Sequence, residues 1–99
     1  METPLQRAMQ KALRNRGAYV FKVHGSEYMP AGLPDLIVCY RGYYAGIEAK
    51  DPANKKRDVR QKYVHRKIRE AGGIVVVAQS VREALAVLDE LDARADEYA

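Results

Sequence analysis

Two acidic residues and a lysine stand at a spacing that could gather them around one divalent cation. Asp35 follows a Gly-Leu-Pro segment, and thirteen positions later come Glu48, Ala49 and Lys50. On an extended strand the side chains of Glu48 and Lys50 leave the same face, while Ala49 points the other way. Carboxylate oxygens suit Mg²⁺ or Mn²⁺, and the cysteine and two histidines of the chain form no spacing that would hold zinc. We therefore expect Asp35 and Glu48 to hold a hard cation beside the amine of Lys50.

The turn between two apolar runs decides whether the two carboxylates meet. One run follows Asp35, the other precedes Glu48, and Arg41 and Gly42 separate them. If Arg41 and Gly42 form a symmetric turn, Asp35 lies opposite Glu48, with Cβ atoms about 4.5 to 5.5 Å apart. Two like charges there require either a raised pKa or a cation, and the cation is the simpler interpretation. An odd-numbered turn would move Asp35 to the other face, and Arg is a poor first residue for a type I′ turn.

The elements that must position these residues are predicted from capping signals and apolar patterns. Thr3 before Pro4 starts a helix that ends near Gly17. The later segments predict strands over 18–24, 36–40 and 43–50, a helix over 58–71, a strand over 74–78 and a helix from Ser80 through Leu91. The continuous β-branched run at 74–78 requires cover on both faces of the sheet. We therefore predict an α/β fold with three layers, α-β-α, around a mixed central sheet, in the element order α-β-β-β-α-β-α.

Length and composition predict one soluble globular domain. The chain has 99 residues, of which 47% are hydrophobic and 30% charged. No apolar run approaches the roughly 20 residues of a membrane-spanning helix, and Met1 opens onto a polar helix rather than a signal peptide. We expect a single domain over residues 1–99 with a frayed tail over 92–99, in a cytoplasmic protein that does not enter a membrane.

Charge is distributed unevenly along the chain. The net charge is +4, but residues 55–69 hold one acid, Asp58, against eight basic residues: Lys55, Lys56, Arg57, Arg60, Lys62, Arg66, Lys67 and Arg69. Residues 83–99 hold six acids and one arginine. A basic run is often only a solvated helix face. Because this one begins five residues after Lys50, we expect its first members, Lys55, Lys56, Arg57, Arg60 and Lys62, to contact the phosphates of a nucleic acid.

The order of the G-x-P-D segment ending at Asp35, the E-x-K segment at Glu48 and a glutamine, Gln61, at the head of the next helix resembles the PD-(D/E)XK nuclease superfamily. Within it, the chain resembles the small stand-alone VRR nuclease domains of phage and bacterial type. The resemblance runs from about Glu2 to Leu91. It implies a restriction-endonuclease-like core and a metal-dependent endonuclease that hydrolyses DNA phosphodiesters, in the host cytoplasm if the chain is phage-encoded.

Metal ligands follow from this resemblance residue by residue. The family's aspartate and glutamate, matched here by Asp35 and Glu48, ligate Mg²⁺, for which Mn²⁺ substitutes, together with the backbone carbonyl at Ala49. An acid on the first helix often completes the site, and Glu2 stands where that acid would be. Glu2 precedes the helix cap at the end of the chain, where fraying is the default.

Catalytic roles follow in the same way for Lys50 and Gln61. The family's lysine orients or activates the attacking water and offsets negative charge on the phosphorane, and its glutamine contacts the site or a backbone phosphate. Gln61 also fits a capping box that begins at Asp58, so a structural role, a catalytic role or both remain open.

Other reactive side chains have both structural and functional interpretations. Tyr28, in the loop before Asp35, is a candidate for contact with a base or sugar. Lys22 either faces the cleft of Lys50 or protects an edge strand. His24 and His65 are expected at a strand end and a helix surface rather than as ligands. Val59, Tyr63, Val64, Ile68 and Ala71 are expected to form the apolar face of their helix, and Cys39 to be a buried small hydrophobic residue.

The leading hypothesis is a Mg²⁺-dependent endonuclease that is selective for DNA structure. The family resemblance to Holliday-junction resolvases implies a branched or four-way DNA partner and a homodimer. The alternative is a nucleic-acid-binding module that keeps the nuclease fold without catalysis, although close carboxylates would repel phosphate in a module of that kind. RNA as the substrate stays open, since a basic helix serves either polymer.

Overall fold

The computed structural model describes residues 2–25, 28–51 and 59–98. Its elements follow the predicted order α-β-β-β-α-β-α. They are α1 (Pro4–Asn15), β1 (Tyr19–Lys22), β2 (Leu36–Tyr40), β3 (Tyr43–Ala49), α2 (Val59–Glu70), β4 (Ile74–Ala78) and α3 (Val81–Glu97). Among the described residues, no helix is long and apolar enough to cross a membrane.

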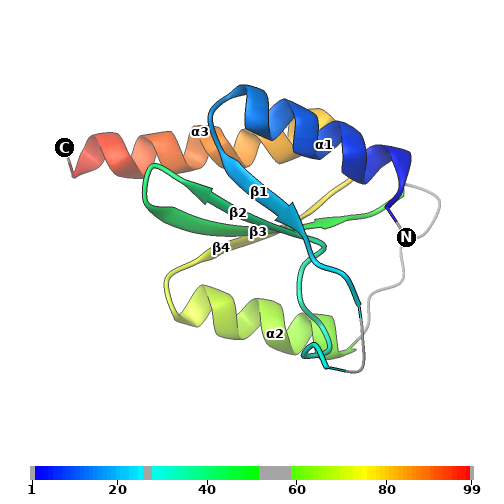
Figure 1. Cartoon of the computed structure of the whole chain (residues 1–99). Coiled ribbons are helices and arrows are strands. Elements are labelled where there is room, and N and C mark those ends of the chain that lie inside the picture. Colours follow the sequence, from blue (N-terminus) through cyan, green and yellow to red (C-terminus); the bar gives the residue numbers. More distant parts are fainter. Residues whose placement is uncertain (1, 26–27, 52–58, 99) are drawn as a thin grey trace.

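The four strands form one mixed sheet in the order β1-β2-β3-β4. The pairs β1–β2 and β2–β3 are antiparallel, and β3–β4 is parallel. Helices α1 and α3 lie together on one face, and α2 lies on the other (Figure 1). The three-layer α-β-α prediction is therefore confirmed.

The hairpin between β2 and β3 has the predicted symmetric register. Leu36 pairs with Ile47, and Tyr40 pairs with Tyr43 across a two-residue turn. Both turn residues have left-handed backbone conformations, with φ of 52° at Arg41 and 87° at Gly42, as a type I′ turn requires. The guanidinium of Arg41 donates hydrogen bonds to two α3 carboxylates at 3.0 and 3.1 Å, Asp92 and Asp96. These bonds explain why an arginine is tolerated at a position that favours glycine or asparagine.

Side-chain alternation assigns each sheet residue to one helical layer. Leu36 and Val38 of β2, with their partners Ile47 and Ala45 of β3, are fully buried in the core beneath α1 and α3. Neighbouring residues along a strand face opposite sides. Asp35 and Glu48 therefore face the layer that contains α2.

Helix α2 packs through a stripe that shares Val64 and Ile68 with the predicted one but not Val59 or Tyr63. Within α2 the side chains that are not exposed are Gln61, Val64, His65 and Ile68, with the spacing i, i+3, i+4, i+7 of one helical face. His65 is fully buried, whereas Val59 and Tyr63 are exposed. The predictions of a surface His65 and of an apolar face through Val59 and Tyr63 were wrong, because the inward face carries two polar residues that an apolar pattern does not detect.

Two other local predictions differ from the structure. Helix α3 continues to Glu97 rather than fraying from Asp92, and the carboxylates of Asp92 and Asp96 hold Arg41. Cys39 is exposed rather than buried. It pairs with Tyr44 in the hairpin and therefore lies on the face opposite the α1–α3 core.

Candidate active site

Asp35 and Glu48 meet at the end of the hairpin, one step beyond the pair formed by Leu36 and Ile47. The backbone N–H of Ala49 donates a hydrogen bond of 2.9 Å to Oδ2 of Asp35. This bond fixes the aspartate against β3, the strand that carries Glu48. The register that the sequence left open is therefore the one that brings both carboxylates to one place.

Glu48 is a buried acid, with 4% of its surface exposed. Its Oε2 accepts a hydrogen bond of 2.8 Å from Nε2 of Gln61, while Oε1 is buried with no hydrogen-bond donor among the described residues. Burial, followed by the negative charge of Asp35, raises the pKa of Glu48 to about 7. The hydrogen bond from Gln61 and the positive charge of Lys50 act in the opposite direction, but burial and Asp35 outweigh them.

The backbone carbonyl of Ala49 is directed toward the same place. The N–H of Lys50 donates to the carbonyl of Ala78 at 2.9 Å, toward β4. No described peptide bond is cis, and in a trans peptide the carbonyl of Ala49 points opposite to the N–H of Lys50. That oxygen therefore faces β2, the side from which Asp35 reaches the N–H of Ala49.

These groups fit a hard divalent cation. Such an ion takes carboxylate and backbone carbonyl oxygens, which Asp35, Glu48 and Ala49 offer. A buried carboxylate oxygen without a donor carries an unfavourable desolvation free energy. A cation among these oxygens would compensate the orphaned Oε1 of Glu48 and offset the repulsion between the two acids.

Glu2 does not join this acid pair. Its Oε1 accepts from Nε of Arg7 at 3.1 Å and its Oε2 from Nε2 of Gln10 at 2.7 Å. These two hydrogen bonds lower the pKa of Glu2, and the bond from Gln10 has the larger effect. Within residues 2–25, 28–51 and 59–98, no group of three His, Cys, Asp or Glu side chains could hold a metal. The predicted third acidic ligand is thus bound to its own helix rather than to the site.

Of the residues predicted from motifs, Gln61 is the one whose place depended most on tertiary structure. It lies in the first turn of α2, and its amide crosses to β3 to hold Glu48. Asp58, the proposed start of a capping box, lies outside the described residues. The hydrogen bond to Glu48 makes Gln61 part of the site.

The predicted phosphate contacts are only partly within the described residues. Lys55, Lys56 and Arg57 lie outside them. Arg60 and Lys62 are exposed at the start of α2, on either side of Gln61 in the sequence. Positive side chains therefore flank the residue that reaches the acid pair.

Lys22 lies at the end of the edge strand β1, and its charge contributes to the lowered pKa of Glu2. His24 is exposed just beyond this strand, as predicted. Neither side chain is part of the acid pair. The edge-strand interpretation of Lys22 accords with its position.

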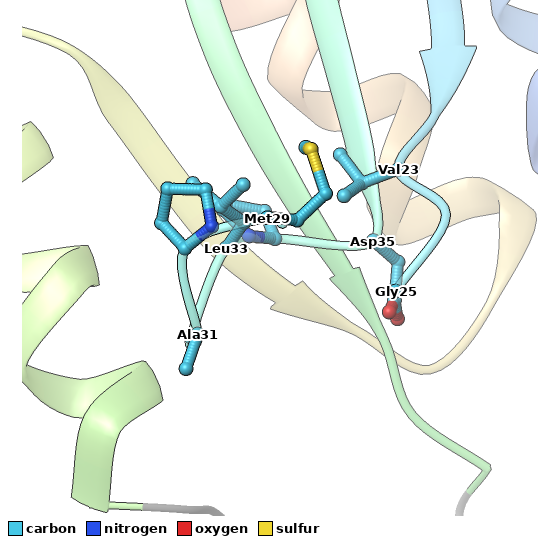
Figure 2. Close-up of a pocket in the computed structure, with 9 residues that line it drawn as sticks. Val23, Gly25, Met29, Ala31, Leu33 and Asp35 are labelled. Carbon is cyan, nitrogen blue, oxygen red and sulfur yellow. The ribbon is translucent and has the colours of Figure 1, made fainter. Parts of the chain in front are cut away.

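A pocket beside Asp35 was not predicted. It has a volume of about 180 Å³ and lies between the end of β1 and the loop that leads to β2. Figure 2 shows Val23, Met29 and Asp35 close together in its lining. Tyr28, the predicted base contact, is 88% exposed in the same loop. The glycines and prolines before Asp35 predicted a loop. The pocket could not be predicted from them, because its lining also includes Val23 and Gly25 at the other end of the connection.

Comparison with solved structures finds two proteins of similar fold. No protein-family model and no curated protein matches the sequence. A solved structure of a VRR_NUC domain is 29% identical, with a TM-score of 0.71, over 89% of this chain and 94% of that chain. Hjc from Archaeoglobus fulgidus, a Holliday junction resolvase from an archaeal hyperthermophile, is 20% identical, with a TM-score of 0.60, over 77% of this chain and 65% of its own. The second similarity is one of fold. The predicted resemblance to the VRR nuclease domain is confirmed.

Proposed function

We propose that this chain, which has the nuclease fold of the VRR_NUC domain, is a metal-dependent endonuclease that hydrolyses DNA phosphodiesters. The observation that carries the proposal is the buried, partly unsatisfied carboxylate of Glu48 beside Asp35. A protein that only bound nucleic acid would gain nothing from two close carboxylates, because they repel phosphate.

The residues of the site divide the work of hydrolysis. When bound, Mg²⁺ or Mn²⁺ supplies polarisation of the scissile phosphate and a lowered pKa of a coordinated water. Asp35, Glu48 and the carbonyl of Ala49 are the proposed ligands, and the N–H of Ala49 orients Asp35. Gln61 orients Glu48. Lys50 adds positive charge where negative charge grows in the transition state, and it orients the attacking water.

Phosphates on either side of the scissile bond would contact the basic residues near the site. Arg60 and Lys62 flank Gln61 on α2, and both residues are exposed. We assign contact with the DNA backbone to these two cations. We assign the same role to Lys55, Lys56 and Arg57 from the sequence. This part of the interface carries affinity rather than sequence preference.

Branched DNA is the proposed substrate, and a homodimer the proposed assembly. The similarity of fold to a protein described as a Holliday junction resolvase supports this proposal. A four-way junction presents two symmetric strands, and the described part of one copy offers one such acid pair, Asp35 with Glu48. The exposed Tyr19 and Phe21 of β1, with Cys39 and Tyr44, lie on the sheet face opposite the core under α1 and α3. We assign the contact with a second copy to these residues.

Cleavage of synthetic DNA tests the function. Wild-type protein, Asp35→Ala and Lys50→Ala are incubated with linear, flapped and four-way DNA in Mg²⁺ or in EDTA. We expect cutting only by the wild type with Mg²⁺, with a loss of at least about 100-fold in each variant and with DNA binding retained. Lys11→Ala, which removes an exposed lysine from α1, is the control for the loss of one positive charge.

Three outcomes would contradict the proposal in whole or in part. Binding without any cutting, unaffected by EDTA, would favour the non-catalytic module. Faster cutting of RNA than of DNA would change the substrate class. Unchanged cutting by both variants would remove Asp35 and Lys50 from the chemistry.

A further inference from the structure

We propose that the pocket beside Asp35 takes one unpaired nucleobase adjacent to the scissile phosphate. This inference rests on the proposed nuclease function and names the feature of DNA that the site selects. The substrate is then DNA with an unpaired or easily unpaired base next to the cut, as at a branch point or flap, rather than an intact duplex.

Apart from Asp35, the side chains that line the pocket are apolar, and Asp35 with backbone groups supplies nearly half of the pocket surface. Val23, Met29, Pro30 and Leu33 supply hydrocarbon and thioether surface, and Asp35 is the one ionisable side chain among the described lining residues. A phosphate would find no cationic side chain in this lining. A neutral ring fits better, since apolar walls contact its faces and a methionine sulfur interacts favourably with aromatic rings. The side chains of the pocket therefore favour a nucleobase over the phosphate backbone of DNA.

Its size accords with one ring system. A volume of about 180 Å³ accommodates a single base. A base enters a pocket in a protein only after it has left its stack and its pairing partner.

The position of the pocket relates this base to the cut. Asp35 is part of the lining and is also one of the two carboxylates of the acid pair. Asp35 thus adjoins both an occupant of the pocket and a phosphate at the acid pair. We therefore assign the base and the scissile phosphate to neighbouring positions of one strand. A stacked base cannot enter a pocket in the protein, and the free energy of unstacking is smallest where the base is already unpaired.

The end of the loop from Gly32 to Asp35, which forms one side of the pocket, is held by packing and one backbone hydrogen bond. Gly32, at φ +90°, is seated against α2 so closely that an added Cβ would lie 2.5 Å from the carbonyl oxygen of Arg60. Pro34 is buried against Gly46 of β3, where a Cβ on the glycine would lie 2.6 Å from Cγ of Pro34. The N–H of Val23 also donates to the carbonyl of Asp35 at 2.8 Å. A side of the pocket that is held in this way loses little conformational entropy on binding.

Binding of DNA with single abasic positions tests the inference. The cut position is first mapped with wild-type protein; if nothing is cut, the branch point of the DNA takes its place as the centre of the scan. Lys50→Ala protein is then titrated in Mg²⁺ with DNAs that lack one base at a time around that position, and Kd is measured by fluorescence anisotropy. We expect one position at which loss of the base weakens binding about 5- to 150-fold, the range for stacking of one base on a protein, while the other positions change Kd less than about twofold.

A second variant ties that position to the pocket. Met29→Ala in the same background should reduce the abasic penalty at this position at least about threefold. Tyr98→Ala, an exposed aromatic residue that follows α3, should leave it unchanged. 2-Aminopurine at the same position should become more fluorescent on binding, because it leaves the stack.

The outcomes separate this inference from the function on which it rests. Cutting by the wild type together with a flat abasic profile, or with a penalty that Met29→Ala does not alter, overturns the base pocket alone. A position-specific penalty without any cutting supports the pocket and overturns the nuclease proposal. Absence of DNA binding overturns both.

Discussion

Glu48 is buried, lies beside the like charge of Asp35 and has one oxygen without a donor among the described residues. Its protonation is therefore linked to folding. Its pKa is raised from the ordinary 4.5 to about 7. The folded protein therefore holds a proton between these values that the unfolded chain releases. The free energy of unfolding of the metal-free protein should accordingly fall as pH rises from about 4.5 to about 7.

We expect this decline to be on the order of 1–3 kcal/mol. Denaturant unfolding in EDTA across this range measures it. Glu48→Gln should remove most of the pH dependence, and Mg²⁺ should restore stability at the upper end, since a cation favours the ionised carboxylate. An unchanged slope in Glu48→Gln would show that another group titrates.

Gln61 is a positioning residue in this arrangement, because it acts through Glu48. Gln61→Ala removes the donor to Oε2 and should weaken Mg²⁺ binding about 10- to 100-fold, the usual effect of losing a group that orients a metal ligand. It should also raise the pKa of Glu48 further and move the pH dependence of activity upward. Calorimetric Mg²⁺ titration measures the first effect and a pH–rate profile the second.

Lys62→Ala is the matched control for Gln61→Ala, since it alters the adjacent exposed residue of the same helix. It should reduce DNA affinity and its salt dependence without changing Mg²⁺ affinity. A purely structural role for Gln61 would appear as lost stability with unchanged Mg²⁺ affinity and an unchanged pH profile.

At the scale of elements, the loop before β2 is held by two close approaches of backbone and ring. Gly32→Ala places a Cβ against the carbonyl of Arg60 on α2 and imposes left-handed strain. We expect a loss of about 1–3 kcal/mol in the free energy of unfolding, together with lower activity as the loop moves. Chemical denaturation with a parallel cleavage assay measures both.

Gly25→Ala provides the control in the same connection between β1 and β2. An added Cβ there meets no atom within 4 Å, so stability should change by less than about 0.5 kcal/mol. Equal losses in the two variants would mean that the fit of Gly32 against α2 contributes nothing specific.

At the scale of the whole molecule, the exposed aromatic side chains of β1 allow a test of whether the protein is a monomer or a dimer. Tyr19 and Phe21 are 68% and 44% exposed and contact each other edge to face. If a second copy covers this face, the wild type should elute at twice the chain mass of 11.2 kDa. Phe21→Lys should elute at the mass of one chain, because a buried unpaired charge opposes association.

Size-exclusion chromatography with light scattering measures these masses. Tyr98→Lys adds the same charge at an exposed aromatic position after α3 and should not change the mass. A single-chain mass for the wild type, or a dimer that tolerates Phe21→Lys, would place the contact elsewhere or remove it.

The acid pair was predictable because it depends on neighbours along the chain. Two apolar runs separated by two residues form a hairpin, and alternation along its strands then determines which side chains share a face. Asp35, Glu48 and Lys50 could thus be grouped from their numbers. The element order followed from capping residues and apolar patterns in the same way, because each signal lies within its own element.

Features that depend on contacts between distant segments needed the tertiary structure. The inward face of α2 carries Gln61 and His65, since the packing surface under this helix includes the polar end of β3. Glu2 was matched to the site by its place in a family pattern, but Arg7 and Gln10 of its own helix hold it. The sequence by itself determined that two carboxylates meet. Tertiary packing decided that one of them is buried, that Gln61 supports it, and that a pocket lies beside the other, because burial depends on which distant surface covers each face.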